Sequence, residues 1–247
     1  MLSVCDPTLC PCSMGIGLAS GAVKEVHSIR KINKWKIEIN DQRIEISPPQ
    51  VYDGRLDRSL VLDKARLLQI REIMMANRTI PGLQYLFRPE LRNNCKGIDR
   101  AIQQRFILAH GLLMKGVFGT PVAMLQGLGI GLTPAGDDFL NGLLTGLAFR
   151  DRPSKYKLSK IRHAIYIASK ANNMIVNSFR YQAYHGLYNR DWKDLLLGLG
   201  LDSVESMDVK SGTSALEDAV NRIISCGSTS GMDELSGFLT AFDMFIK

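Results

Sequence analysis

The sequence contains few cysteines, and their number and spacing exclude two classes of protein. The five are Cys5, Cys10, Cys12, Cys95 and Cys226. An odd number does not suit the fully paired framework of a small disulfide-stabilised secreted domain. The pair in Cys10-Pro11-Cys12 is not followed by a second pair or a Cys/His knuckle at zinc spacing. We therefore expect free thiols in a cytoplasmic protein that holds no metal and no cofactor.

A continuous apolar segment that could cross a membrane is also missing. The longest uncharged stretch, residues 116–136, is long enough to span a bilayer, but it contains six glycines and two prolines. That composition is typical of loops and turns. The first 20 residues lack a basic segment and carry Asp6, Pro7 and Pro11, so they do not resemble a secretion signal. We predict no membrane association.

Long blocks of one charge are absent as well. The net charge of +7 comes from residues 1–120, which hold 18 Lys+Arg and 11 Asp+Glu, whereas residues 121–247 hold 13 of each. The excess is scattered and interleaved with acids, unlike the blocks of roughly five or six like charges found in nucleic-acid-binding tails. We therefore predict no nucleic-acid partner.

Apolar residues follow two different periods along the chain. Between residues 22 and 51 they alternate with polar residues, as in strands, with a hairpin turn expected at Asn40 and Asp41. Val23 and Val26 belong to the first of these strands. From Leu60 onward the spacing is helical. Helices are expected at 60–76, 98–117, 157–185 (closed by Gly186), 191–199 and 214–225, with a loop at 77–96 that includes a short strand at 84–87.

These periods predict an α+β fold. Residues 1–57 would form a β-rich N-terminal segment. Residues 58–247 would form a mainly helical region that carries an internal loop–helix repeat, and the two parts would make one compact domain.

The repeat relates residues 133–147 to residues 228–242, at an offset of 95 residues without a gap. Six of the fifteen positions are identical, where roughly one identity is expected by chance. The identical pairs are Gly136/Gly231, Asp138/Asp233, Leu140/Leu235, Gly142/Gly237, Leu144/Leu239 and Thr145/Thr240. Each copy has the form of a loop that leads into a helix.

The repeated glycines predict that the two helices touch. Acids in a first helical turn have a purely structural explanation, because they complement the helix dipole. Gly142 and Gly237 do not, since a glycine in mid-helix costs about 1 kcal/mol relative to alanine. We expect something to approach the backbone closely there. The small faces of the two helices would pack around a pseudo-two-fold axis, bringing two helix N-termini and two carboxylates into one site.

Helix N-termini bind anions, and the glycine-rich stretch 127–132 before the first copy favours a small anion such as phosphate or a carboxylate. The acids oppose this, because Asp137 or Asp138 would repel an anion unless a cation, a protonated carboxyl group or an arginine intervened. They could instead bind Mg²⁺ or a substrate N–H group. The residues alone leave these alternatives open.

Two motifs resemble the AllH family, which is linked to the oxamate carbamoyltransferase of anaerobic allantoin breakdown. The family motif G-x-G-P-G-L-T-P-[SA]-G-D-D-x-L-x-G is matched by residues 127–142, and the motif G-H-T-S-G-x-D-x-L-x-G by residues 227–237. This sequence departs from the motifs at Ile130, which replaces the proline, and at Ser228, which replaces the histidine.

The resemblance implies a transferase of purine catabolism that moves a carbamoyl group between oxamate or oxalurate and phosphate. Its small anionic substrate would be oxamate, oxalurate, phosphate or carbamoyl phosphate, and its other partners would be further subunits of the enzyme. The catalytic residues implied are Asp138 and Asp233. The substrate-binding residues implied are Gly129, Gly131, Thr133, Gly136, Asp137, Asn141, Thr229, Ser230 and Gly231.

Two other functions stay open at this stage. The chain could be a non-catalytic structural subunit of a multi-protein complex, whose glycines serve helix packing alone. It could also be a metal-dependent hydrolase that uses Asp137, Asp138 and Asp233, although no histidine lies near these motifs.

Overall fold

The computed structural model describes residues 3–5, 15–17, 28–33, 36–45, 52–56, 60–92, 96–150, 155–200 and 209–244. Over these ranges the chain is mostly helical. The α-helices are α1 (Lys64–Ala76), α2 (Gly97–Met114), α3 (Gly119–Leu125), α4 (Ala135–Phe149), α5 (Lys155–Ala168), α6 (Met174–His185), α7 (Arg190–Gly198), α8 (Val209–Ile224) and α9 (Ser230–Asp243). Two short 3₁₀ helices are η2 (Leu83–Leu86) and η3 (Pro89–Leu91). No helix within the described ranges has the length and apolarity needed to cross a membrane.

The strands within the described ranges are short, and each pairs with the strand next to it in the sequence. β1 (Ser3–Cys5) and β2 (Gly15–Gly17) form a parallel pair, and β3 (Ile29–Asn33), β4 (Lys36–Ile39) and β5 (Gln42–Glu45) form an antiparallel sheet in that order. Asn40 and Asp41 connect β4 to β5 with φ angles of 47° and 67°. Positive φ at both central residues is typical of the two-residue turns that match strand twist. The predicted turn is confirmed.

The predicted α+β class with a β-rich N-terminal segment is wrong, because the fold is mostly helical. Alternation of polar and apolar residues produced local strand pairing in β3, β4 and β5. Among the side chains described between residues 28 and 45, only Ile39 is buried. Val23 and Val26, which were expected in a strand, lie outside the described residues. The division of the chain at residues 57 and 58 stays a prediction.

Several helices agree with the sequence pattern. α1, α2 and α7 lie where helical periodicity was found, and α6 ends at Gly186, which has a φ of 73°. The helix expected at 157–185 is instead two helices, α5 and α6. Asn173 separates them, because its side chain accepts hydrogen bonds from the N–H groups of Ile175 and Val176 and so begins a new helix.

Three other local predictions differ from the structure. The stretch 116–136, interpreted as loop, contains the short helix α3. Residues 84–87, interpreted as a strand, lie largely in the 3₁₀ helix η2. The helix expected to begin at Ser214 begins at Val209. In each case the segment is too short, or its apolar spacing too irregular, for periodicity to identify its structure.

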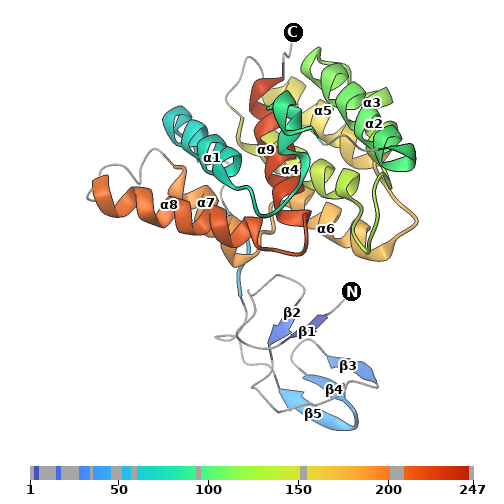
Figure 1. The fold of residues 1–247 in the computed structure, drawn as a ribbon. Coiled ribbons are helices and arrows are strands. Elements are labelled where there is room, and N and C mark those ends of the chain that lie inside the picture. Colours follow the sequence, from blue (N-terminus) through green and yellow to red (C-terminus); the bar gives the residue numbers. More distant parts are fainter. Residues whose placement is uncertain are drawn as a thin grey trace.

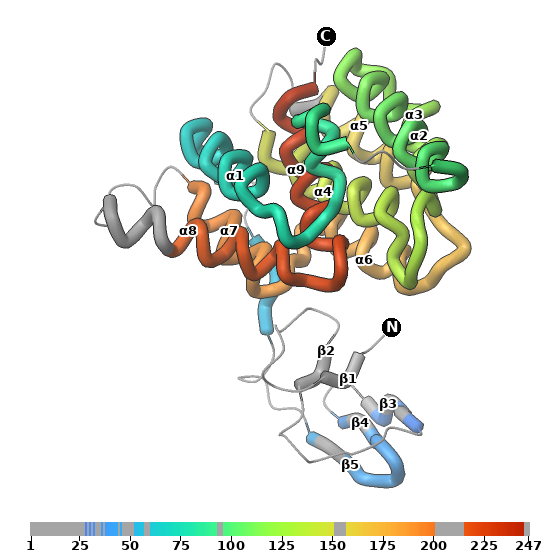
Figure 2. The backbone as a smooth tube through the Cα atoms, in the orientation of Figure 1, coloured from blue at the N-terminus to red at the C-terminus, as the bar shows by residue number. Residues whose placement is uncertain are grey.

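The two copies of the repeat form α4 and α9, which lie together at the centre of the helical part (Figures 1 and 2). α1, α7 and α8 lie on one side, and α2, α3, α5 and α6 on the other. The leucines of α4 belong to the apolar cluster that includes α2, α3 and α5. Leu235, Phe238 and Leu239 of α9 belong to the cluster that includes α1, α7 and α8. Each repeat helix thus anchors one half of the core.

Two glycines allow α4 and α9 to approach each other. A Cβ atom at Gly142 would overlap the carbonyl oxygen of Glu234, and one at Gly237 would overlap that of Phe139. Phe139 and Glu234 are themselves 95 residues apart, so the two contacts are equivalent under the repeat. Such reciprocity is the contact pattern of a two-fold axis. The expected close approach at both glycines is confirmed.

Replacing Gly142 or Gly237 with alanine should destabilise the protein by several kcal/mol, about 2 to 5, because backbone atoms of the other helix must move apart. Gly111→Ala is the matched control. Gly111 is also inside a helix, but nothing lies within 4 Å of an added Cβ. It should leave stability unchanged or raise it by up to about 1 kcal/mol. Urea denaturation measures all three variants, and equal effects at the three positions would contradict the packing described here.

Candidate functional site

A cavity of about 440 Å³ lies at the N-terminal end of α9, beside α4, α6 and α7. Polar groups from both copies of the repeat line it, and Ile175, Phe179, Tyr188 and Trp192 contribute an apolar wall. No lysine or arginine from the described ranges contributes to the lining, whereas the carboxyl groups of Asp138 and Glu234 do. The cavity therefore combines hydroxyl, amide and carboxyl groups with a largely apolar surround.

Two hydroxyl groups join the copies of the repeat at the cavity wall. Thr133 precedes α4, Ser230 begins α9, and their side-chain oxygens are 3.2 Å apart. Both hydroxyls also hydrogen-bond to the carboxyl group of Asp138. The loop before one helix and the first turn of the other thus supply two hydroxyls to one acid.

Asp138 is only 3% exposed. Burial raises the pKa of its carboxyl group to about 7, and the negative charge of Asp137 raises it further, while hydrogen bonds from Ser230 and Thr133 and the charge of Arg180 oppose the shift. No described residue hydrogen-bonds to its buried Oδ2 atom. Asp138 can therefore gain or lose a proton near neutral pH, and Oδ2 is left for another partner.

Glu234 is a second acid of the cavity, and sequence reasoning missed it. Burial raises the pKa of its carboxyl group to about 8, with a further contribution from the charge of Asp138. Trp192 Nε1 donates to its Oε2 atom at 2.6 Å. The equivalent position in the first copy is Phe139, a fully buried core residue. Because the two copies differ in character here, the comparison between them gave no signal for Glu234.

Asp233, the repeat equivalent of Asp138, faces a different part of the protein. Its Oδ1 atom accepts a hydrogen bond from the N–H of Leu83 at 2.9 Å, at the start of η2. Burial raises the pKa of this carboxyl group to about 8. Asp233 does not line the cavity. Asp138 and Asp233, which were predicted to share one site, lie near enough for the charge of Asp138 to raise the pKa of Asp233. Of these two acids, only Asp138 lines the cavity.

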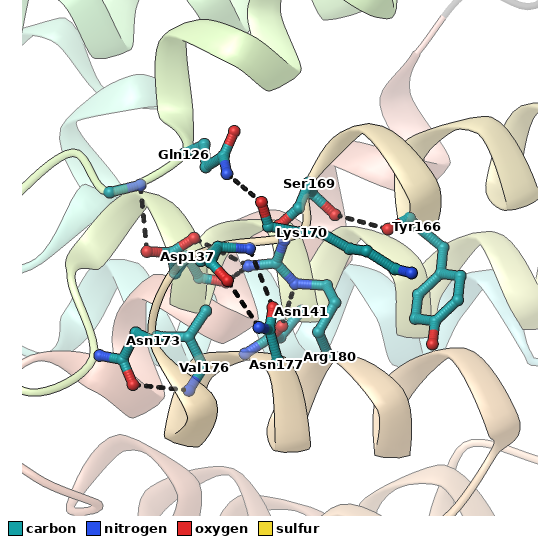
Figure 3. A network of polar contacts seen from close by, with 12 residues as sticks. Gln126, Asp137, Asn141, Tyr166, Ser169, Lys170, Asn173, Val176, Asn177 and Arg180 are labelled. Atoms are coloured by element: carbon teal, nitrogen blue, oxygen red, sulfur yellow. Dashed lines mark hydrogen bonds and ion pairs between the residues drawn. The ribbon is translucent and has the colours of Figure 1, made fainter.

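Asp137 forms a buried ion pair with Arg180 of α6, which the sequence analysis did not identify (Figure 3). Arg180 Nη2 donates to Asp137 Oδ1 at 3.0 Å, and the N–H of Gly127 donates to Asp137 Oδ2 at 3.1 Å. Both side chains are almost fully buried. A signal was present in the sequence, since Arg180 lies at helical spacing between Val176 and Ala183 on the apolar face of α6.

Arg180 also orients the side chain of Asn141. Its Nε atom donates to Asn141 Oδ1 at 2.6 Å (Figure 3). An asparagine whose oxygen is already engaged presents its amide nitrogen as a donor. Because Asn141 lines the cavity, the Asp137–Arg180 pair fixes a hydrogen-bond donor at the cavity wall.

Backbone groups at the start of α4 are mostly satisfied within the protein. The N–H of Gly136 donates to Leu128 O at 2.8 Å, and those of Asp137 and Asp138 donate to Pro134 O. At the start of α9, the N–H of Gly231 donates to Cys226 O at 3.2 Å. These groups are not left to form an anion cradle of the kind that helix N-termini offer.

The predicted binding residues divide into two sets. Those that line the cavity are Thr133, Asn141, Ser230 and Gly231. Those that do not are Gly129, Gly131, Gly136, Asp137 and Thr229. Gly129 and Gly131 have φ angles of 124° and 110°, a conformation that glycine tolerates best. Thr229 hydrogen-bonds to the Asp233 carboxyl group. The first set lies on α4, on the first turn of α9 and on the loop before α4, and the second set lies beside it on the same elements.

Residues 125–242 match the family model described as oxamate carbamoyltransferase subunit AllH. The predicted resemblance is thereby confirmed over a little under half of the chain, in the stretch that holds both motifs and all the predicted site residues. The family description names a subunit of a carbamoyltransferase of purine catabolism, and an enzyme with a named subunit has other subunits. No curated protein and no solved structure matches the chain.

Asp233→Asn should change how stability depends on pH. The folded protein keeps a proton on Asp233 up to about pH 8, whereas the unfolded chain loses it near pH 4. Folding therefore becomes less favourable as pH rises between these values, by at most about 1.4 kcal/mol per pH unit. Asparagine has no proton to lose, so the variant should gain stability relative to wild type across this window.

Urea denaturation at pH 5, 7 and 9 measures the difference. The control is Asp218→Asn, which removes an exposed acid from α8 and should run parallel to wild type. Parallel curves for Asp233→Asn as well would contradict the assignment of a proton to this buried carboxyl group.

Proposed function

We propose that the chain is a subunit of an oxamate carbamoyltransferase-like enzyme and that its cavity binds the substrate that donates or accepts the carbamoyl group. The observation that carries this proposal is the lining of the cavity. Thr133, Asp138 and Asn141 come from one family motif and Ser230 and Gly231 from the other. Residues that the resemblance links to substrate thus gather around one space large enough for a small molecule.

The reaction transfers a carbamoyl group between nitrogen and phosphate. A phosphate oxygen attacks the carbamoyl carbon of oxalurate, a C–O bond forms, and the C–N bond to the oxamate nitrogen breaks. Phosphate loses one proton and the departing nitrogen takes one up, so the proton balance closes. The enzyme must hold the two reactants together, stabilise negative charge on the carbamoyl oxygen and move this proton.

The cavity has groups suited to two of these tasks. The amide nitrogen of Asn141 is a donor for the carbamoyl oxygen, because the side-chain oxygen of Asn141 is engaged by Arg180. Asp138 contacts both hydroxyls and has a pKa of about 7, which suits a group that relays a proton at neutral pH. We assign proton transfer to Asp138 and binding of the carbamoyl oxygen to Asn141.

Phosphate needs positive charge that the cavity does not offer within the described ranges. Arg180, which contacts the lining residue Asn141, is committed to Asp137, Asn141 and the carbonyl of Ser169. We therefore assign the groups that neutralise phosphate to another subunit. The family description, which names a subunit, supports this division.

The alternative of a metal-dependent hydrolase finds less support. The three aspartates that it needs face different surroundings: Asp137 pairs with Arg180, Asp233 faces Leu83, and only Asp138 lines the cavity. Over the described residues, no group of three or more His, Cys, Asp or Glu side chains is arranged to hold a metal ion. The activity of an Asp138 variant distinguishes a catalytic subunit from a purely structural one.

Asp138→Asn should lower kcat for phosphorolysis of oxalurate by about 10²- to 10⁴-fold, the usual contribution of an acid–base group. The chain is purified together with its partner subunits, and carbamoyl phosphate formation is measured. Asp218→Asn, an exposed change of the same kind on α8, should leave kcat unchanged. Full activity of Asp138→Asn would favour a structural role for the chain, and an inactive wild-type complex would refute the proposed reaction.

A further inference from the structure

We propose that Glu234, together with Asp138, determines specificity by selecting a substrate that presents an amide N–H₂ group to the cavity and rejecting one that presents a carboxylate. The inference rests on the proposed function for the choice of ligands. It adds a residue that neither the motifs nor the family description assigns.

The first argument is the orientation of the Glu234 carboxyl group. Trp192 Nε1 holds its Oε2 atom at 2.6 Å. The side chain lines the cavity, and Trp192 packs against Phe238 at a centroid distance of 5.4 Å. Because one oxygen is fixed by an anchored tryptophan, Oε1 is the oxygen that a ligand in the cavity can reach.

The second argument is that Asp138 also lines this space. Its hydrogen bonds with Thr133 and Ser230 leave Oδ2 buried without a partner among the described residues. The charge of Asp138 also raises the pKa of Glu234. The cavity therefore offers two carboxyl oxygens and, in the part of the chain described, no lysine or arginine to offset them.

A primary amide fits this arrangement and a carboxylate does not. The two N–H bonds of an amide can be donated to two carboxylate oxygens, while its carbonyl oxygen accepts from the amide nitrogen of Asn141. A carboxylate in the same position has only acceptors to set against Asp138 and Glu234. The apolar wall strengthens the discrimination, because repulsion between like charges grows when water is excluded.

Oxamate and oxalate provide the test, because they differ only in having an amide or a carboxylate at one end. Their dissociation constants for the full chain are measured by titration calorimetry at pH 9, where Asp138 and Glu234 are both ionised. We expect oxamate to bind about 10- to 100-fold more tightly than oxalate, the range expected for one unpaired buried charge. Inorganic phosphate, a third probe, should bind no better than oxalate.

Glu234→Gln should abolish this preference. The glutamine oxygen can still accept from Trp192, so its N–H₂ group would turn toward the cavity and donate to a carboxylate. Oxalate should then bind about 10-fold more tightly than to wild type, and oxamate less tightly. Glu217→Gln, an exposed change on α8, is the control and should leave the ratio of the two constants unchanged.

The outcomes separate this inference from the proposed function. If the complex forms carbamoyl phosphate from oxalurate but its chain binds oxamate and oxalate equally, or binds neither, the specificity role of Glu234 is refuted and the carbamoyltransferase proposal stands. If Glu234→Gln leaves the ratio as in wild type, Glu234 does not determine it. If the complex is inactive but the chain prefers oxamate and loses that preference in Glu234→Gln, the inference survives and the reaction is wrong.

Discussion

The rest of the structure depends on the close crossing of α4 and α9. Gly142 and Gly237 remove the side chains that would otherwise separate these helices, and each glycine faces a backbone carbonyl of the other helix. Glycine in a helix is unfavourable by about 1 kcal/mol, so two of them at equivalent positions indicate that contact between the helices outweighs this cost. With both helices at the centre, one apolar cluster forms on each side. The crossing of α4 and α9 therefore divides the core into these two apolar clusters.

The same crossing brings polar groups from distant parts of the chain to one cavity. Thr133 and Ser230 are 97 residues apart and their oxygens are 3.2 Å apart. The acids Asp138 and Glu234 line the same cavity. Burial is the largest cause of both raised pKa values, and a neighbouring negative charge adds to each, that of Asp137 at Asp138 and that of Asp138 at Glu234. Packing thus gives the cavity its chemical character.

A buried ion pair between Asp137 and Arg180 supports this arrangement. Arg180 connects α6 to the first turn of α4 through Asp137 and holds the oxygen of Asn141. Removing one member of such a pair leaves an uncompensated charge in the interior, which is more costly than losing an exposed pair. Asp137 and Asp138 are neighbours in the sequence, yet one is an ionised anchor for a helix and the other is an acid that titrates near neutral pH. The difference comes from what each side chain faces in the fold.

The sequence by itself determined the features that are local or repeated. The turn at Asn40 and Asp41, the end of α6 at Gly186, the two family motifs and the need for a close approach at Gly142 and Gly237 were all readable from residue type and spacing. Alternation in the N-terminal stretch was misleading about fold class, because a short-range pattern predicts strand pairing but cannot tell whether a sheet packs on a core.

Only the tertiary structure decided which residues share the cavity. Asp138 and Asp233 are equivalent in the repeat, but Asp233 faces η2 from a different part of the chain. Glu234 enters the cavity through its contact with Trp192, 42 residues away, and Arg180 reaches Asp137 from 43 residues away. A side chain's burial and hydrogen-bond partners are set by elements that meet only when the chain is folded, and its pKa follows from them. No spacing along the sequence contains that information.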